Sequence, residues 1–141
     1  MTPPRRIFID TPVVLYALGA PHPDREACRG VLAAAAAGTL ELHASTQLVQ
    51  EVTFHRLRRG PAHAAVAAGR LLLDACVLYP VDSAVLAGPL DLVEAGPLRG
   101  RDALHAATAL EHGFAELVTT DPDFGGTPGL TTVTPQHVLA G

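Results

Sequence analysis

The sequence contains no lysine: all ten of its basic residues are arginine. A Walker-type phosphate loop, a Schiff-base enzyme and a phosphoryl-transfer site built on lysine are therefore excluded, because each of them needs a lysine side chain. The formal net charge of −4 also indicates no global basic field for nucleic-acid binding. Any such binding has to depend on local groups of arginine, and the densest of these is Arg56, Arg58 and Arg59.

Cysteines and long apolar runs are also scarce. Cys28 and Cys76 are too few for a disulfide scaffold and fit no metal-ligand spacing, so we expect both to be small core residues. The seven histidines show no zinc-binding spacing. No apolar run approaches the roughly 20 residues that span a bilayer. Asp10 and Pro12 also interrupt the apolar segment that a signal peptide would need. The sequence therefore predicts a cytoplasmic protein that does not contact a membrane.

The chain has 141 residues, of which 48% are hydrophobic, and this suffices for one compact domain over residues 1–141. Short apolar segments predict strands at 6–10, 40–44, 77–81, 116–120 and 131–134. Helical patterns lie between them, from Pro12 to Gly19 and at 24–37, 45–59, 62–76, 82–94 and 101–112, with a short helix after Pro135. Gly88-Pro89 is expected to break or kink one of these helices. The alternation predicts the α/β class: a three-layer α/β/α domain with a central parallel sheet of four or five strands.

Two of the predicted strands end in carboxylates. Asp10 follows the apolar run Ile7-Phe8-Ile9, and Asp121 follows the strand at 116–120, with Asp123 two residues later. Because ligands of parallel sheets bind outside the carboxyl ends of the strands, we expect these acids at one edge of the sheet. Negative charge gathered at one edge is costly unless a cation lies there. The pattern therefore predicts a divalent metal site.

Two further acids are predicted to join this site. Glu51 lies in a largely apolar stretch of the helix at 45–59, which Ser45 is expected to cap. Asp102 lies in the first turn of the helix at 101–112, where the helix dipole and free N–H groups keep a carboxylate ionised and oriented. Four acids without a lysine suit Mg²⁺ or Mn²⁺, which take oxygen ligands. His105, three residues after Asp102, could face the site, but a packed or surface histidine is the favoured interpretation.

Each acid also has a purely structural explanation. Asp10 and Asp102 suit helix caps, and Asp121 begins an ordinary Asp-Pro-Asp turn. Glu51 has potential partners on its own helix, His55 one turn later and Arg58 across the turn. The joint metal site is favoured because the separate explanations leave open why two strands end in aspartate at corresponding positions.

Four segments of the chain resemble the signature blocks of a known family. They are Ile9-Asp10-Thr11, Gln50-Glu51-Val52, the segment 101–107 (Arg-Asp-Ala-Leu-His-Ala-Ala) and the segment 119–124 (Thr-Thr-Asp-Pro-Asp-Phe). In order and spacing they are similar to the blocks of PIN-domain ribonucleases. The length is similar to that of the VapC-type toxins of bacterial type II toxin–antitoxin pairs, so the resemblance covers essentially the whole chain.

The resemblance implies cleavage of RNA that depends on Mg²⁺ or Mn²⁺, a homodimer, and neutralisation by a small antitoxin protein. The acidic quartet of the family corresponds to Asp10, Glu51, Asp102 and Asp121, with Asp123 as an auxiliary candidate. Arg56, Arg58 and Arg59 are then expected to contact either the RNA or the antitoxin, and the charge of −4 slightly favours the antitoxin. The chain departs from the family at Pro12, where members often carry serine or asparagine.

Two other functions are compatible with parts of the pattern. A non-catalytic α/β module could use the same acids to bind the arginines of a protein partner, and it would be distinguished by RNA cleavage that is lost on chelation. A haloacid-dehalogenase-like phosphatase also begins with a strand that ends in aspartate. That enzyme needs a second aspartate where this chain has Pro12, and it needs a lysine, so it is the less favoured alternative.

Overall fold

The computed structural model describes residues 2–96, 98, 100–121 and 127–141. Its helices and strands follow one another in the order β1 (Arg5–Ile9), α1 (Thr11–Leu18), α2 (Arg25–Ala36), β2 (Leu40–Ser45), α3 (Thr46–Arg59), α4 (Ala62–Ala75), β3 (Cys76–Tyr79), α5 (Ala87–Ala95), α6 (Gly100–Glu111), β4 (Glu116–Val118), β5 (Thr131–Val133) and α7 (Pro135–Ala140). The predicted α/β class is confirmed, and the predicted strands all form, with ends that differ by one or two residues. Within the described ranges no helix combines the length and the apolar character needed to cross a membrane.

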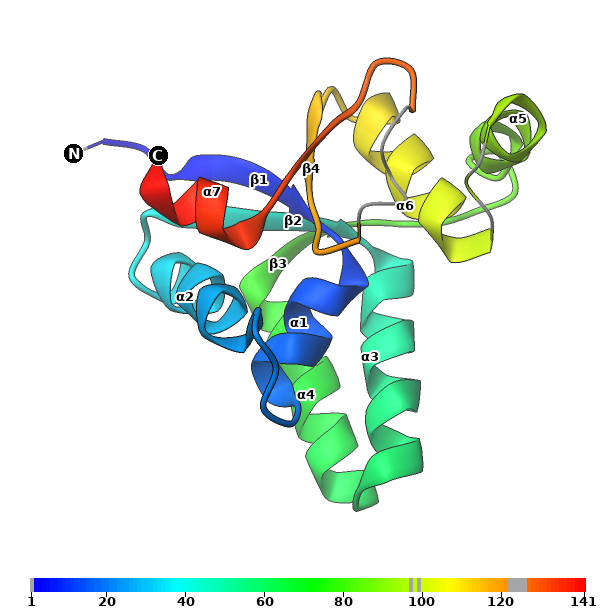
Figure 1. Ribbon diagram of the computed structural model, residues 1–141. Helices are drawn as coiled ribbons and strands as arrows, with labels where there is room; N and C mark the ends of the chain where they lie inside the picture. The colour runs from blue at the N-terminus through cyan, green and yellow to red at the C-terminus, as the bar shows by residue number, and fades with distance from the viewer. Residues whose placement is uncertain (1, 97, 99, 122–126) are drawn as a thin grey trace.

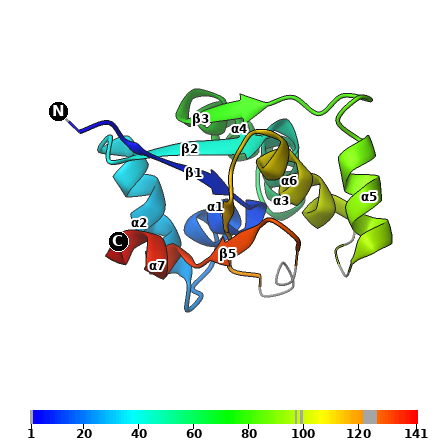
Figure 2. The ribbon, with the colours of Figure 1, turned by 90° about the horizontal axis from the view of Figure 1, so that it is seen from above.

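The five strands form one parallel sheet in the order β3-β2-β1-β4-β5. From β1 the chain first builds outward through β2 to β3, and it then crosses to the other side of β1 to add β4 and β5 (Figures 1 and 2). The direction of building therefore switches between β1 and β4. In parallel sheets a crevice opens at the carboxyl ends of the strands beside such a switch point, and ligands bind there.

Helices cover both faces of the sheet because the side chains of each strand alternate between the faces. Ile7 and Ile9 of β1 belong to a core that includes residues of α1, α2, α3, α4 and α7. Phe8, between them, faces the opposite way and packs with alanines of α6 and with Leu117 of β4. Figure 1 shows α6 and α5 above the sheet and α1 and α2 below it. This is the predicted three-layer arrangement, with the acidic residues at one end of the sheet.

The segment around Gly88-Pro89 differs from the prediction. A helix over 82–94 with a break at this pair was expected, whereas α5 begins only at Ala87 and contains both residues in its first turn. Proline is tolerated in a first turn because its missing N–H would have no partner inside the helix there. The pair therefore marks the start of a shorter helix and does not interrupt a longer one.

The two cysteines behave as expected of small apolar residues. Cys28 is fully buried in the core, and Cys76 is half-buried and packs against the same core. Burial raises the pKa of both thiols to about 11, so neither is a reactive thiolate near neutral pH.

Candidate active site

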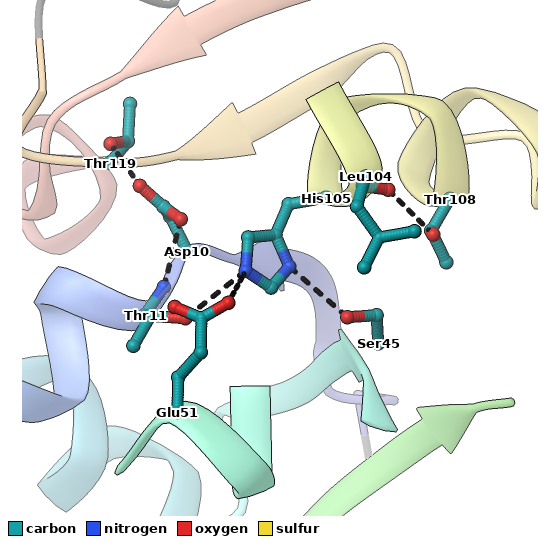
Figure 3. Close-up of polar contacts among 8 residues, drawn as sticks. All are labelled: Asp10, Thr11, Ser45, Glu51, Leu104, His105, Thr108 and Thr119. Carbon is teal, nitrogen blue, oxygen red and sulfur yellow. Dashed lines mark hydrogen bonds and ion pairs between the residues drawn. The ribbon is translucent and has the colours of Figure 1, made fainter. Parts of the chain in front are cut away.

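Asp10 lies at the carboxyl end of the central strand and is almost completely buried, with 2% of its surface exposed. It occupies the N-cap position of α1, where its Oδ1 accepts a hydrogen bond of 2.9 Å from the backbone N–H of Thr11. Its other oxygen, Oδ2, accepts a hydrogen bond of 2.8 Å from the hydroxyl of Thr119 (Figure 3). The capping role considered for Asp10 is therefore real, and it orients the carboxylate at the edge of the sheet.

Thr119 links the two strand-end aspartates, and the sequence interpretation did not assign it a role. The pairing of Ile9 with Val118 places Thr119 opposite Asp10, so Asp121 lies two residues beyond the position that matches Asp10. The Thr119 hydroxyl donates to Asp10 and accepts a hydrogen bond of 3.0 Å from the backbone N–H of Asp121. The two aspartates are thus not at corresponding positions of their strands, but one threonine side chain connects their segments.

Glu51 contacts His105, the histidine that follows Asp102 on α6. The Glu51 side chain is 12% exposed, and its Oε1 lies 2.9 Å from Nε2 of His105, which is 1% exposed (Figure 3). His105 is packed, as the favoured interpretation has it, and its ring also contacts a residue of the predicted acidic set. His105 lies one helical turn after Asp102 on α6, and that spacing was the available signal for it. Neither His55 nor Arg58 provides this contact with Glu51.

The four carboxylates influence one another electrostatically. Burial raises the pKa of Asp10 to about 6, against the opposing effects of His105 and the Thr119 hydrogen bond, and the charge of Asp102 adds to the rise. Burial also raises the pKa of Asp102, and the charges of Asp121 and Glu51 raise it further. Asp102 therefore interacts with each of the other three acids, which gathers the predicted quartet into one electrostatic cluster.

The donor set of this cluster suits a hard divalent cation, because all four side chains offer carboxylate oxygens. A positive ion would also offset the repulsion that raises the pKa values of Asp10 and Asp102. As the side chains stand, no three histidine, cysteine, aspartate or glutamate residues in the described ranges lie close enough together to hold an ion. Asp123 lies outside the described residues. The described residues therefore fit a metal ion in their donor atoms and charge, but their present positions do not form a complete binding site.

A groove of about 630 Å³ lies between α1 and α3. Pro12, just after Asp10, and His55, one turn after Glu51, line it, and Arg56 and Arg59 line it further along α3. Arg58 does not line the groove, so only two of the three predicted arginines, Arg56 and Arg59, can contact a ligand there.

Aromatic and imidazole groups complete the groove. The rings of Tyr16 and His22 stack with their centroids 3.9 Å apart. Burial and the nearby arginines lower the pKa of His55, which keeps its ring uncharged at neutral pH. Its buried Nδ1 has no hydrogen-bond partner among the described residues. A ligand in the groove would therefore meet cationic, aromatic and neutral polar groups.

Comparisons with known proteins agree with this geometry. Residues 7–130 match the model of the PIN domain family. Ribonuclease VapC7 of Mycobacterium tuberculosis (strain ATCC 25618 / H37Rv) is 35% identical over 132 residues, which cover 92% of this chain and 91% of that protein.

Solved structures show the same fold at lower identity. The M. tuberculosis toxin VapC20, described as cleaving the sarcin-ricin loop, superposes with a TM-score of 0.70 at 19% identity over 86% of this chain and 95% of that chain. A toxin–antitoxin complex from Klebsiella pneumoniae gives 0.69 at 22% identity over 92% and 97%. From the family match and the 35% identical relative, we conclude that this chain belongs to the PIN domain family.

Proposed function

We propose that this protein is a metal-dependent endoribonuclease that acts as the toxin of a toxin–antitoxin pair. The observation that carries the proposal is the group of carboxylates at the switch point of the sheet, in which Asp10 is buried and Asp102 interacts with each of the other three acids. Membership of the PIN domain family and 35% identity to a ribonuclease give the activity. The family match leaves the haloacid-dehalogenase alternative without support.

The four acids have distinct roles in the proposed reaction. Asp10, Asp102 and Asp121 hold the cation directly or through water, and Glu51 completes the set. Nucleases of the family are generally metal-dependent, and the all-oxygen donor set supports Mg²⁺ or Mn²⁺ as the ion. When bound, the ion makes a water molecule more acidic and stabilises negative charge on the scissile phosphate. Asp123 remains a prediction as an additional ligand.

The residues of this chain position the reacting groups. Hydrogen bonds from Thr11 and Thr119 fix both oxygens of Asp10, so its carboxylate needs little reorganisation when the ion binds. Glu51 lies on α3 one turn before His55, which lines the groove, and it orients or deprotonates the attacking water. In this step the water oxygen bonds to phosphorus while its proton passes to Glu51. The bond from phosphorus to one ribose oxygen breaks, and that oxygen takes up a proton and leaves as a hydroxyl group.

Arg56 and Arg59 are proposed to contact a partner in the groove between α1 and α3. Both RNA and an acidic segment of an antitoxin have negative charge that suits these side chains, and the same groove can bind either of them. The apolar residues of the groove, such as Leu15 and Leu18, support the antitoxin, because they offer surface for apolar side chains of a peptide. We therefore propose a small antitoxin as the protein partner.

Two other features remain proposals. A homodimer is supported by exposed apolar side chains on α4, where Leu71 and Leu73 are 55% and 58% exposed. Sedimentation of the purified protein measures this directly. A cytoplasmic location stays a prediction.

Cleavage of RNA by the purified protein tests the central proposal. The wild type should cleave RNA in the presence of Mg²⁺ or Mn²⁺ and lose this activity in excess chelator. Asp102→Asn should be inactive because the amide lacks the charge that the ion needs. Glu111→Gln is the matched control, since it removes an exposed acid from the same helix. Cleavage that persists in excess chelator, or in Asp102→Asn, would contradict the metal mechanism, and a folded protein that never cleaves RNA would favour the non-catalytic binding module.

A further inference from the structure

Ser45, His105 and Glu51 form a continuous chain of hydrogen bonds behind the acidic cluster. Nδ1 of His105 lies 3.1 Å from the Ser45 hydroxyl, and its Nε2 lies 2.9 Å from Oε1 of Glu51 (Figure 3). Nε2 also lies 3.2 Å from the hydroxyl of Thr11, the residue next to Asp10. The imidazole ring therefore connects α6 with α3 and with the start of α1.

The hydrogen-bonding capacities of these groups fix the direction of the bond to Glu51. An ionised carboxylate only accepts hydrogen bonds, so Nε2 of His105 carries the proton that is donated to Glu51. The Ser45 hydroxyl serves either form of the ring, because it donates to Nδ1 of a neutral ring and accepts from Nδ1 of a charged one. Each of the three groups has the partner that its chemistry requires.

Ser45 provides independent support for this arrangement. It occupies the N-cap position of α3, where serine usually accepts a hydrogen bond from the helix backbone, and it was predicted to do so. Its side chain makes no capping bond and is completely buried. Its hydroxyl contacts His105 instead. A helix that gives up a common stabilising contact for a contact to one histidine indicates that the position of that histidine matters.

The order serine, histidine, carboxylate also occurs in nucleophilic hydrolases, but here it cannot serve that chemistry. A nucleophile must reach the substrate, whereas Ser45 is 0% exposed and lies at the inner end of the chain. The exposed end is Glu51, whose charge influences Asp102 in the acidic cluster. The hydrogen-bonded chain therefore links buried Ser45, through His105, to the carboxylate of Glu51.

We propose that His105, itself fixed by Ser45, is a positioning residue that holds Glu51 in place for cation binding. A glutamate side chain has three rotatable bonds, so a fixed partner keeps its carboxylate beside Asp102 at little cost in conformational entropy when the ion binds. This inference rests on the proposed function only in so far as Glu51 belongs to the cation site. His105 itself does not contact the substrate or the ion.

The test measures Mn²⁺ binding by electron paramagnetic resonance on the purified protein, with circular dichroism and thermal unfolding to show that each variant is folded. His105→Leu replaces the imidazole with an apolar side chain of similar size and so removes the hydrogen bonds of both ring nitrogens. Its Mn²⁺ affinity should fall about 10-fold or more, as is common when a group that orients a metal ligand is lost. His105→Gln retains an N–H near the position of Nε2 and should restore most of the affinity.

Two further variants separate positioning from general damage to the core. In a Glu51→Gln background, adding His105→Leu should change Mn²⁺ affinity by less than about 2-fold, because the group through which His105 acts has already been altered. Thr108→Val is the matched control. It removes another buried hydroxyl of α6, whose hydrogen bond of 2.7 Å goes to the backbone of Leu104, and it should leave Mn²⁺ affinity unchanged (Figure 3).

The outcomes distinguish this inference from the proposed function. Wild-type affinity in a folded His105→Leu variant, or an undiminished effect of His105→Leu in the Glu51→Gln background, would overturn the positioning role alone. If His105→Leu does not fold, two other variants decide. The positioning role is supported if His105→Gln has near-normal Mn²⁺ affinity and Ser45→Ala has reduced Mn²⁺ affinity. Wild-type Mn²⁺ affinity in Ser45→Ala counts against the role. A wild-type protein that neither binds Mn²⁺ nor cleaves RNA would instead refute the proposed function.

Discussion

Asp10→Asn is expected to stabilise the protein at neutral pH, in the absence of divalent ions, while abolishing RNA cleavage. The Asp10 carboxylate is buried, and its pKa rises from the ordinary 3.8 to about 6, chiefly because burial disfavours its charged form. At about 1.4 kcal/mol per pKa unit, this difference means that ionised Asp10 reduces the free energy of unfolding by about 3 kcal/mol. The asparagine side chain has nearly the same shape and no charge to bury.

The full 3 kcal/mol is an upper bound, because the variant also changes two hydrogen bonds. The amide oxygen can still cap α1 at Thr11, but the amide nitrogen must donate to Thr119, which at present donates to Asp10. A hydrogen bond to a charged group contributes more than one between neutral groups, by about 1 kcal/mol. The expected net stabilisation near pH 7.5 is therefore about 1–3 kcal/mol.

The stabilisation should depend on pH in a defined window. A group whose pKa is raised on folding contributes its stability fully below its unfolded pKa, and this contribution is lost as the pH rises through its folded pKa. For Asp10 the window lies between 3.8 and about 6. The wild type should therefore lose stability relative to Asp10→Asn as the pH rises through this range, and the difference should nearly vanish near pH 4.

Urea unfolding in chelator at pH 4 and pH 7.5 measures the effect for both proteins. Asp74→Asn controls for the loss of one negative charge from a chain of net charge −4, because Asp74 is exposed on α4. Adding Mn²⁺ should stabilise the wild type more than Asp10→Asn, because an ion that binds only the folded state shifts the equilibrium toward it. The reasoning is refuted if Asp10→Asn is no more stable than wild type at pH 7.5, or if the difference is the same at both pH values.

Three further experiments probe other parts of the site. Mg²⁺ and Mn²⁺ should support RNA cleavage, whereas Ca²⁺, with longer bonds and looser geometry, should bind yet give little product in the same assay. The double variant Arg56→Ala, Arg59→Ala should weaken RNA binding and flatten its salt dependence, or weaken antitoxin binding, and titrations against each partner distinguish the two. Arg58→Ala should change neither affinity, because Arg58 does not line the groove. Equal effects of all three substitutions would contradict the proposal that the groove binds the partner. Thr119→Val removes a hydrogen bond that lowers the pKa of Asp10, so the acid limb of the cleavage rate against pH should move to higher pH, and an unchanged profile would show that Thr119 does not act on Asp10.

Most of the fold could be predicted because local patterns and burial agree along this chain. The central strand shows its burial in three consecutive apolar residues, and the Asp10-Thr11-Pro12 sequence identifies a strand end followed by a helix start. The start of α5 could not be located in this way, because Gly88-Pro89 is as compatible with a helix break as with a first turn. In the structure Gly88 lies close to Ala107 of α6, and a contact of this kind cannot be seen in the local sequence.

The candidate site shows a similar division. The acids were identifiable because strand ends and first helical turns are recognisable in sequence. Their hydrogen-bond partners Thr119 and His105 were not assigned to the site, since nothing in the local sequence marks a threonine or histidine whose partner lies far away along the chain. Thr119 contacts Asp10 across 109 positions, and His105 contacts Glu51 across 54. Such contacts follow from the order of strands in the sheet, which spacing along the chain does not contain.

The order of strands also has a consequence for synthesis on the ribosome. The centre of the sheet is made first, as β1, but its neighbour β4 begins only at Glu116. The hydrogen bond from Thr119 to Asp10 and the placement of Asp121 therefore wait until most of the chain has left the ribosome. Contacts between residues so far apart in sequence form late, because a long loop must close first. A nascent chain that stops short of β4 carries Asp10 without Thr119 and Asp121, so the acidic cluster stays incomplete until synthesis is nearly finished.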